Sequence, residues 1–357
     1  MKILVIADDF TGAAEIAAAG VRFGLSARVA NCLSGADGAD LIAINTNSRL
    51  LSADRAVQAV EQAIGIGDTS PFNLIYKKTD SVLRGPVAAE VEAVARLTGR
   101  RGTMLCPQNP SKGRTIVDGV YRINGVPIAQ TQFARDPDFP ATSSKAFDLL
   151  NRDGRAGRQI CEQRLIVGEG DDATRLLHWA AQAAHDLLPA GGVDFFEAVV
   201  SHRGRRSLRT DWLALQRGRT VMVCGSACDS SREFVRKIES AALCRAPESW
   251  IADATASLAR CDFAAIAFPE IIEPSLSDHL PIALTQIGHI DQLLIEGGST
   301  AASIFARFGW TQFDVLGELC TGVAVLKPTG GPVVAVKPGS YPWPESVLED
   351  VCSAASN

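Results

Sequence analysis

The sequence lacks the features by which several large functional classes are recognised. Its 357 residues contain no apolar run long enough to span a bilayer, and a net charge of −5 offers no basic surface for nucleic acid. Nine cysteines are present without a CxxC pair, so we expect reduced thiols rather than disulfides or zinc ligands. Asp8 and Asp9 interrupt the first apolar run, which argues against a signal peptide and favours a cytoplasmic protein.

Several catalytic motifs are absent as well. There is no GxxxxGK[ST] loop, no HExxH, no GxSxG and no EF-hand loop. Residues 164–177 (RLIVGEGDDATRLL) imitate a dinucleotide fingerprint, with Gly168 and Gly170 after an apolar run. Asp171 and Asp172 stand where the pyrophosphate would lie and would repel it. The segment leaves one alternative open, a NAD-dependent oxidoreductase of a small hydroxy acid.

Apolar runs that alternate with helical patterns are the main feature that is present. This rhythm predicts βαβ units, and therefore a parallel sheet covered by helices. A polar segment at 201–218 has no hydrophobic period and predicts a linker. We therefore predict an α/β protein of two domains, 1–205 and 206–357, each a mostly parallel sheet flanked by helices. The predicted strands are 2–7, 41–45, 73–77, 103–106, 220–224, 263–267, 292–295 and two or three within 313–337, and the first helices are 11–23, 53–64 and 86–97.

Residues 107–140 differ from their surroundings in being rich in Gly, Pro, Asn and Asp. Alternating runs at 115–123 and 126–133 are joined by Asn124-Gly125, a pair typical of tight hairpin turns. We therefore predict a β-hairpin insertion in the first domain.

Three polar clusters follow predicted strands of the first domain. Two adjacent carboxylates at the end of a buried strand, Asp8 and Asp9, are unfavourable unless cations or hydrogen-bond donors face them. The other clusters are KKTDSVLRG (77–85) and PQNPSKGRTIVDG (107–119). Because the carboxyl ends of parallel strands meet at one sheet edge, we expect the clusters to form a small polar pocket. Arginines and lysines among carboxylates suit a hydroxyl-rich anion such as a sugar acid.

Glycine-containing turns after strands of the second domain suggest phosphate binding. In LLIEGGSTAASIFARFG (293–309), Gly-Gly before Ser-Thr exposes more backbone N–H groups than an ordinary helix cap needs. The N-terminus of a helix favours a phosphate group. VMVCGSACDSSREF (221–234) makes a similar transition, and Gly322 and the run VKPGS (336–340) offer further contacts. Phosphoryl transfer from a nucleotide to a small acid would use both halves of the chain.

Four segments occur in the order found in a known family. ADDFTGA (7–13), KKTDSVLRG (77–85), PQNPSKGRTIVDGVYRING (107–125) and DP (136–137) resemble the signature blocks of the four-carbon acid sugar kinases. Members of that family use ATP to phosphorylate the 4-hydroxyl of tetronates such as threonate, erythronate or 3-oxo-tetronate. Their N-terminal domain holds the sugar acid and their C-terminal domain holds ATP, so the resemblance implies a kinase that uses ATP and Mg²⁺.

The resemblance also implies roles for individual residues, although the acceptor of the hydroxyl proton, the metal ligands and the preferred tetronate stay open. The candidates are Asp8, Asp9 and Asp80 for catalysis, Thr11, Lys78, Ser81, Arg84, Asn109 and Arg114 for substrate binding, and Ser226, Gly297, Gly298, Ser299, Thr300, Gly322 and Gly339 for the nucleotide.

The sequence departs from the family pattern in three respects. The chain is shorter than many relatives, and Gly85-Pro86 stands where Gly-Asn is expected. The last loop reads KPGSYPWPES, where relatives follow KPG with Phe-Gly. This loop keeps a third hypothesis open, a non-catalytic sugar-acid sensor with a degenerate nucleotide site. The partners we expect are a sugar acid and ATP, without nucleic acid or membrane, and a homodimer stays open.

Overall fold

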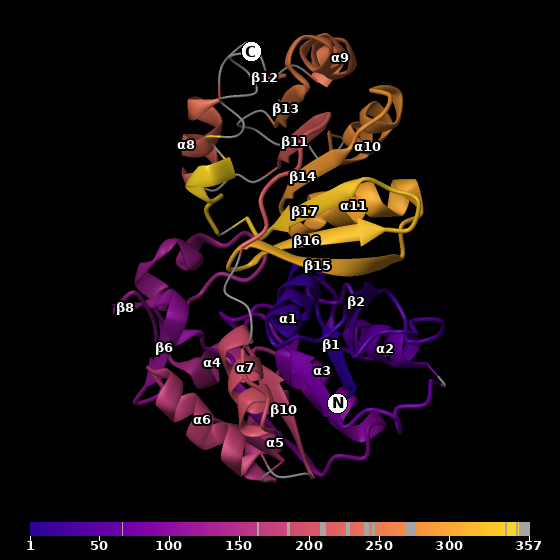
Figure 1. Cartoon of the computed structure of the whole chain (residues 1–357). Coiled ribbons are helices and arrows are strands. Elements are labelled where there is room, and N and C mark those ends of the chain that lie inside the picture. The colour runs from indigo at the N-terminus through magenta and orange to yellow at the C-terminus, as the bar shows by residue number, and fades with distance from the viewer. Residues whose placement is uncertain are drawn as a thin grey trace. The chain divides into compact units, whose positions relative to one another are not determined.

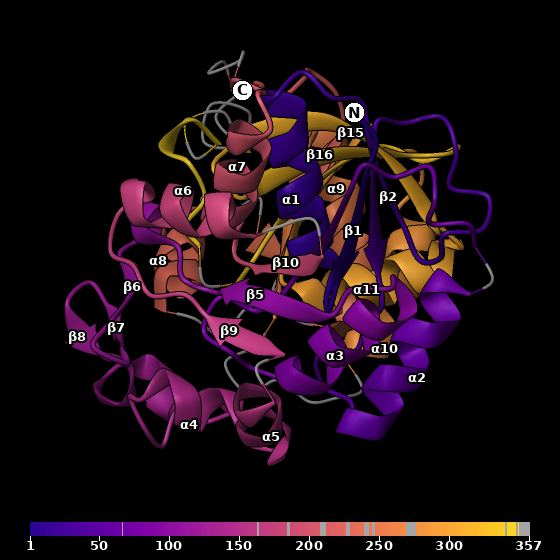
Figure 2. The same cartoon turned by 90° about the horizontal axis from the view of Figure 1, so that it is seen from below.

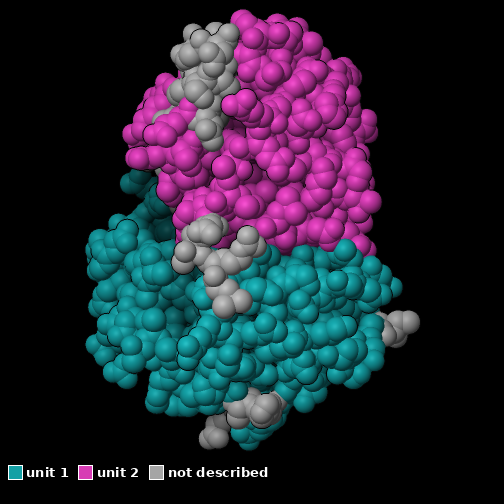
Figure 3. Space-filling model, viewed as in Figure 1, with its two compact units in different colours: residues 1–209 teal, residues 210–357 magenta. Residues whose placement is uncertain are grey.

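The chain divides into two compact units, Met1–Arg209 and Thr210–Asn357 (Figures 1 and 3). They are seen in a computed structural model. It describes residues 1–65, 67–162, 164–183, 186–207, 212–225, 229–238, 243–244, 247–268, 276–339, 341–347 and 349.

The sheet of the first unit is parallel throughout. Parallel strands that are buried on both faces are typically continuous apolar runs. All five residues of β1 are buried completely. Four strands, β1, β3, β4 and β5, lie where the sequence predicts them, and β9 is the apolar run that precedes Gly168. Two strands were missed: β2, which is short and carries Arg28, and β10. Across the sheet the order is β2 (Ala27–Ala30), β3 (Leu41–Asn45), β1 (Ile3–Ala7), β4 (Leu74–Lys78), β10 (Leu187–Gly191), β5 (Gly102–Cys106) and β9 (Leu165–Val167).

Helices cover both faces of this sheet. Figure 2 shows α1 and α7 on one face and α2 and α3 on the other, and each pair is in contact. Because α1 lies against both the sheet and α7, its Ala-rich sequence is buried over nearly its whole circumference. The three predicted helices are confirmed as α1, α2 and α3. The helices are α1 (Phe10–Arg22), α2 (Ala53–Ile64), α3 (Val87–Leu97), α4 (Ala146–Leu150), α5 (Arg155–Cys161), α6 (Ala173–Gln182) and α7 (Val193–His202).

The predicted hairpin is present within a small antiparallel sheet of three strands, β6 (Arg114–Val117), β7 (Val120–Ile123) and β8 (Val126–Pro127). Asn124 and Gly125 both have positive φ, as the predicted turn requires. The single strand expected at 115–123 was wrong, because Asp118-Gly119 forms a second positive-φ turn inside it. The second run ends early as well. Residues after Pro127 form the 3₁₀ turns η2 (Ile128–Gln130) and η3 (Gln132–Arg135), preceded in the chain by η1 (Pro110–Lys112).

The sheet of the second unit is mixed. Strands β12, β13, β11, β14 and β17 run parallel to one another, whereas β16 pairs antiparallel with both β17 and β15. The region 313–337, where two or three strands were expected, holds three. No described helix is both long and apolar enough to cross a membrane. The strand order is β12 (Leu243–Cys244), β13 (Phe263–Ala267), β11 (Thr220–Cys224), β14 (Gln292–Glu296), β17 (Val333–Lys337), β16 (Val323–Pro328) and β15 (Gln312–Cys320), with α8 (Asp229–Lys237), η5 (Pro247–Ser249), α9 (Trp250–Cys261), α10 (Leu276–Gln286) and α11 (Gly298–Phe308).

Gly191 is required where β10 lies between β4 and β5. A Cβ at this position would lie 1.9 Å from the carbonyl oxygen of Cys106, and the residue has φ +147°. We expect Gly191→Ala to lower the free energy of unfolding by about 2 kcal/mol, since strands must separate to admit the methyl group. Thermal unfolding followed by circular dichroism measures this loss. Gly157→Ala in α5 is the control, because its nearest neighbouring atom would be 3.5 Å away; equal melting temperatures for the two variants would contradict the prediction.

Candidate active site

The strand register of the first unit brings several polar loops to one edge of its sheet. Ala7, the last residue of β1, is paired with Asn45 of β3 and with Lys78 of β4. Gly191 of β10 is paired with Lys78 and with Cys106 of β5. Residues that follow these strands therefore leave the sheet at the same edge, which is where ligands bind in open parallel sheets.

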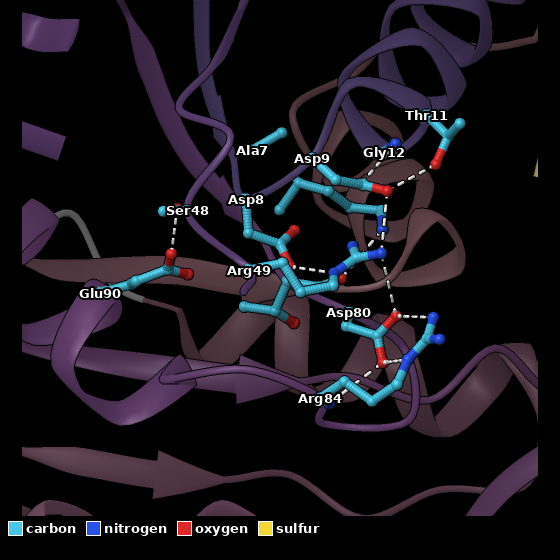
Figure 4. A network of polar contacts seen from close by, with 12 residues as sticks. Ala7, Asp8, Asp9, Thr11, Gly12, Ser48, Arg49, Asp80, Arg84 and Glu90 are labelled. Carbon is cyan, nitrogen blue, oxygen red and sulfur yellow. Dashed lines mark hydrogen bonds and ion pairs between the residues drawn. The ribbon is translucent and has the colours of Figure 1, made fainter. Parts of the chain in front are cut away.

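Three aspartates from two of these loops gather around one arginine (Figure 4). Arg49, in the loop after β3, donates from Nε to Asp8 Oδ2 at 2.7 Å and from a terminal nitrogen to Asp9 Oδ2 at 2.8 Å. The same terminal nitrogen lies 3.6 Å from Asp80 Oδ1. The Arg49 side chain is only 16% exposed, so its attraction to the carboxylates is poorly screened by water. The guanidinium therefore offsets the repulsion among the three carboxylates.

The three aspartates differ in how many of their oxygens are engaged. Asp9 caps α1, because Oδ1 accepts from the backbone N–H of Gly12 and Oδ2 from the Thr11 hydroxyl. Both oxygens of Asp80 accept from Arg84. Asp8 Oδ1 is buried and has no hydrogen-bond partner among the described residues. Asp8 is thus the aspartate of the three with an oxygen available for a ligand.

Asp80 and Arg84 form a two-bond ion pair at the start of the loop after β4. Arg84 Nε donates to Oδ2 at 3.0 Å and a terminal nitrogen to Oδ1 at 2.8 Å, while its other terminal nitrogen donates to Asp136 at 3.2 Å. Backbone N–H groups of Val82 and Arg84 also donate to Asp80. The Arg84 side chain is 28% exposed, so part of its guanidinium surface is accessible to an anion.

Neighbouring cations lower the pKa of two of the three aspartates, Asp8 and Asp80. Burial acts to raise the pKa of Asp80, but Arg84 and Arg49 outweigh it and hold that pKa well below its usual range. Burial opposes Arg49 and Lys77 at Asp8 in the same way, and the pKa of Asp8 is lowered. Burial raises the pKa of Glu90, which lies behind Asp8 and pairs with Lys77 at 3.0 Å. Asp8 and Asp80 are therefore charged at neutral pH, and each is paired with an arginine, Arg49 or Arg84.

Lys78 lies beside the first turn of α1. A Cβ on Gly12 would be 3.3 Å from its Nζ, and its ammonium donates to the carbonyl of Thr79 at 2.9 Å. Glu15 of α1 is shared between two lysines, with Lys78 at 3.6 Å and Lys112 at 2.6 Å. Two cations, one from the end of β4 and one from η1, thus meet at Glu15 of the capped helix.

The remaining substrate-binding candidates separate into two groups. Arg114 of β6 donates to the Ser81 hydroxyl, and both are buried, so the small sheet is joined to the loop after β4. Asn109 is not part of the network of Asp8, Asp9 and Asp80. Its side-chain oxygen instead accepts from the backbone N–H of Asp194, in α7, at 3.2 Å. The Asn109 side chain is packed against Gly192 at the start of α7, and its Nδ2 has no partner among the described residues.

Arg49 is the central residue of this network and was missed by sequence reasoning. The sequence does contain a pattern that marks Arg49, because the polar run Thr46-Asn47-Ser48-Arg49 directly follows the predicted strand 41–45. The rule that identified the other clusters applies equally to this one. Glu15 and Glu90 were missed for a different reason: each lies within a helix rather than directly after a strand, so the rule that identified the loop clusters does not reach it.

Glycine turns of the second unit also share an edge. Cys224 of β11 and Lys337 of β17 are both paired with Glu296 of β14, so the turns after these parallel strands lie together. Gly225 is in the first of these turns, where a Cβ would approach the Thr300 hydroxyl to 2.4 Å. The turn after β14 holds Gly297, the first residues of α11 are the candidates Gly298, Ser299 and Thr300, and the turn after β17 holds Gly339.

Gly322 belongs to the same edge. It precedes β16, whose Ala324 is paired with Val336, and its N–H donates to Glu318 at 2.9 Å. Ser226 lies outside the described residues. Gly297 has φ +99° and precedes α11, whose first residues have no side-chain cap. The N-terminal N–H groups of α11 are therefore not occupied by a capping side chain.

The segment that imitates a dinucleotide fingerprint has its backbone occupied within the protein. The N–H and carbonyl groups of Gly170 both pair with Ile116 of β6. A Cβ on Gly168 would lie 2.5 Å from the sulfur of Cys106 and 3.0 Å from the Trp179 ring. Asp172 caps α6 by accepting from the N–H of Arg175 at 2.8 Å. These glycines are explained by close packing rather than by a pyrophosphate.

Comparison with known proteins finds a family match over most of the chain. The model of the family described as "Sugar-binding N-terminal domain" matches residues 3–230. That range includes every described residue of the network in the first unit.

Individual relatives are consistent with this match. The chain is 39% identical to a D-threonate kinase of Salmonella typhimurium over 153 residues, which are 42% of this chain and 36% of that kinase. It is 31% identical to a 3-oxo-tetronate kinase of Brucella melitensis, over 49% of this chain and 42% of that kinase. The matched segments thus span less than half the length of these curated relatives. The crystal structure of Haemophilus influenzae protein HI1011 has the same fold, with a TM-score of 0.69, 21% identity and 99% of each chain covered.

The low pKa of Asp80 predicts an acid-sensitive fold. Because this pKa is lower in the folded protein than in the unfolded chain, the carboxylate stabilises the fold above the unfolded value of about 4. The contribution is lost as the pH falls through the folded pKa. We expect Asp80→Asn to lower the free energy of unfolding at neutral pH by about 2 kcal/mol, and by progressively less in acid.

Urea unfolding at a series of pH values measures this dependence. Asp138→Asn, at an exposed position, is the matched control. A destabilisation by Asp80→Asn that is the same at neutral and acid pH would show that its charge is not what stabilises the fold.

Proposed function

We propose that this chain, which belongs to the family of the sugar-binding N-terminal domain, is an ATP-dependent kinase. Its acceptor is the terminal C4 hydroxyl of a four-carbon sugar acid. The observation that carries the proposal is the gathering of Asp8, Asp9 and Asp80 around Arg49 at one sheet edge. The names of the relatives, D-threonate kinase and 3-oxo-tetronate kinase, support a tetronate as the acceptor.

The first unit supplies groups that suit both ends of a sugar acid. Arg84 is the more exposed of the two arginines that contact Asp80. Two of its nitrogens are held by Asp80, so the terminal nitrogen that donates to Asp136 is the one with which it would bind the carboxylate of an acid. Carboxylates such as Asp80 accept hydrogen bonds from sugar hydroxyls. Lys78 and Lys112 add positive charge beside the N-terminus of α1, where it can balance an incoming anion.

Asp8 is the carboxylate best suited to the acceptor hydroxyl. Its Oδ1 has no partner among the described residues, whereas the oxygens of Asp9 and Asp80 are engaged. In the proposed reaction the hydroxyl oxygen bonds to the γ-phosphorus of ATP, the bond to the β–γ bridging oxygen breaks, and ADP leaves. The hydroxyl proton passes to Asp8. The low pKa of Asp8 makes it chiefly an orienting group, which suits a transition state in which positioning dominates.

The second unit supplies groups that suit the phosphates of ATP. The turns after β14 and β17 contain Gly297, Gly298 and Gly339, and α11 presents an N-terminus without a side-chain cap. The described residues contain no group of three acidic, His or Cys side chains placed to hold a metal ion. This fits a Mg²⁺ ion that arrives with the nucleotide, since such ions are held largely by phosphate oxygens and water. Bound there, the ion would neutralise charge on the phosphates.

An assay of ADP release tests the proposal. The protein is mixed with Mg-ATP and in turn with D-threonate, D-erythronate and 3-oxo-tetronate, and phosphorylated product is identified by mass spectrometry. Turnover with at least one of these acids is the expected result. Absence of turnover with all three, together with a rise in melting temperature on adding an acid, would instead favour the sensor. Reduction of NAD without ADP release would favour the oxidoreductase.

We expect Asp8→Asn to lower kcat by about 100-fold or more, because the amide loses the charged oxygen that orients the acceptor hydroxyl and receives its proton. The KM for the sugar acid should change far less, since Arg84 and Lys78 remain in place. Asp138→Asn serves as the control for an exposed aspartate. A kcat within about twofold of wild type would assign the proton to another group.

We expect Arg84→Ala to raise the KM for the sugar acid by about tenfold or more, through loss of the charged hydrogen bonds to its carboxylate. The KM for ATP should stay close to wild type. Steady-state kinetics with each substrate varied in turn separates the two constants. An equal rise in both would place Arg84 outside the acid-binding site, and Arg155→Ala on the first unit's surface, 37% exposed, controls for the removal of an arginine.

A further inference from the structure

A fully buried ion pair lies under the glycine turns of the second unit. Glu296 ends β14 and Lys337 ends β17, and the two are direct partners in the strand register. Lys337 Nζ lies 3.1 Å from Glu296 Oε1, and the side chains are 1% and 0% exposed. Neither residue is among the nucleotide-binding candidates, but Glu296 directly precedes Gly297 and Lys337 is two residues before Gly339.

The Glu296 carboxylate joins two further segments to this pair. Its Oε1 accepts from the hydroxyl of Ser231 on α8, the helix that follows β11. Its Oε2 accepts from the indole N–H of Trp343 at 3.4 Å. One carboxylate thus contacts the helix after β11, the end of β17 and the loop that follows β17. Burial raises the pKa of Glu296, and Lys337 opposes that rise.

Lys337 in turn shapes the loop that contains Gly339. Its ammonium donates to the carbonyls of Pro338, at 3.1 Å, and of Tyr341. The Trp343 ring lies 5.6 Å from the same ammonium, within range of a cation–π interaction. The carbonyl of Lys337 accepts from the N–H of Gly297 at 2.9 Å, which links this loop directly to the turn before α11.

Stability alone is a poor reason for such a pair. Taking two charges out of water costs free energy that their attraction often does not recover, and apolar residues of similar size would commonly serve as well. A buried ionic network does fix the relative positions of the segments it joins. Here the joined segments are the ones that carry the glycine turns.

We propose that Glu296, Lys337 and Trp343 are positioning residues that hold the turns at Gly297–Thr300 and Pro338–Gly339 in the geometry that receives the nucleotide phosphates. The inference rests on the proposed kinase function and extends it. It also accounts for the unusual loop KPGSYPWPES, since Trp343 within that loop supplies an anchor onto Glu296. The altered loop is on this view a differently fastened nucleotide loop rather than a degenerate one.

Trp343→Phe is the first test, because it removes the N–H donor while keeping an aromatic ring. We expect the KM for ATP to rise by about tenfold, with the KM for the sugar acid unchanged. Trp310→Phe is the matched control: it lies just past the other end of α11, where its ring stacks on Phe308 at 4.6 Å. An ATP KM that is the same in both variants would overturn the proposal.

Hydrogen–deuterium exchange provides a readout that does not depend on turnover. Amides of Gly297–Thr300 and of Gly339 should exchange faster in Trp343→Phe, and faster still in Glu296→Gln, than in wild type or Trp310→Phe. Unchanged exchange there would refute the positioning role even if the enzyme were active. If the wild-type protein released no ADP but these amides still exchanged faster in the variants, the kinase proposal would fail and the positioning role would stand. The two failures are therefore distinguishable.

Discussion

Repulsion between like charges at the edge of a parallel sheet is the constraint on which the first unit depends. Parallel strands deliver whatever follows them to one edge, and here β1 and β4 deliver Asp8, Asp9 and Asp80. Arg49 makes this arrangement tolerable by contacting all three from the loop after β3. The result is a site that is charged yet largely shielded from water, in which electrostatic interactions are strong. This is the site that we propose for the sugar acid.

The second unit meets a related constraint by a different route. Its edge carries glycine turns, which have little side chain of their own to fix them. Beneath them Glu296 and Lys337 form a buried pair whose remaining hydrogen-bonding capacity is directed at neighbouring segments. The charged side chains of the first unit surround Arg49 at the edge that we propose binds the ligand. Those of the second unit, Glu296 and Lys337, instead hold the backbone of neighbouring segments. Both uses depend on low exposure to water.

Glycine after a strand has two different explanations in this chain: close packing at Gly168 and Gly170, and the start of a helix at Gly297. Gly168 and Gly170 follow a strand in a pattern that suggests nucleotide binding, but Cys106, Trp179 and the backbone of β6 fill the space around them. Gly297 also follows a strand, and its surroundings leave the first turn of α11 without a side-chain cap. The acidic residues after Gly170 were the feature of the sequence that distinguished the two cases, because Asp172 caps its helix.

The sequence by itself determined the α/β class, most of the strands of the two sheets, and the three aspartates that follow two of them, but not β2, β10 or β12. It could do so because strands buried on both faces are continuous apolar runs and a charge directly after such a run must lie at the sheet edge. Only the tertiary structure decided that Arg49 is their shared partner, that Asp9 is used as a helix cap, and that Asn109 serves α7. These outcomes depend on which loops approach one another across the strand order. That order follows from packing between segments far apart in the chain, which local patterns do not record.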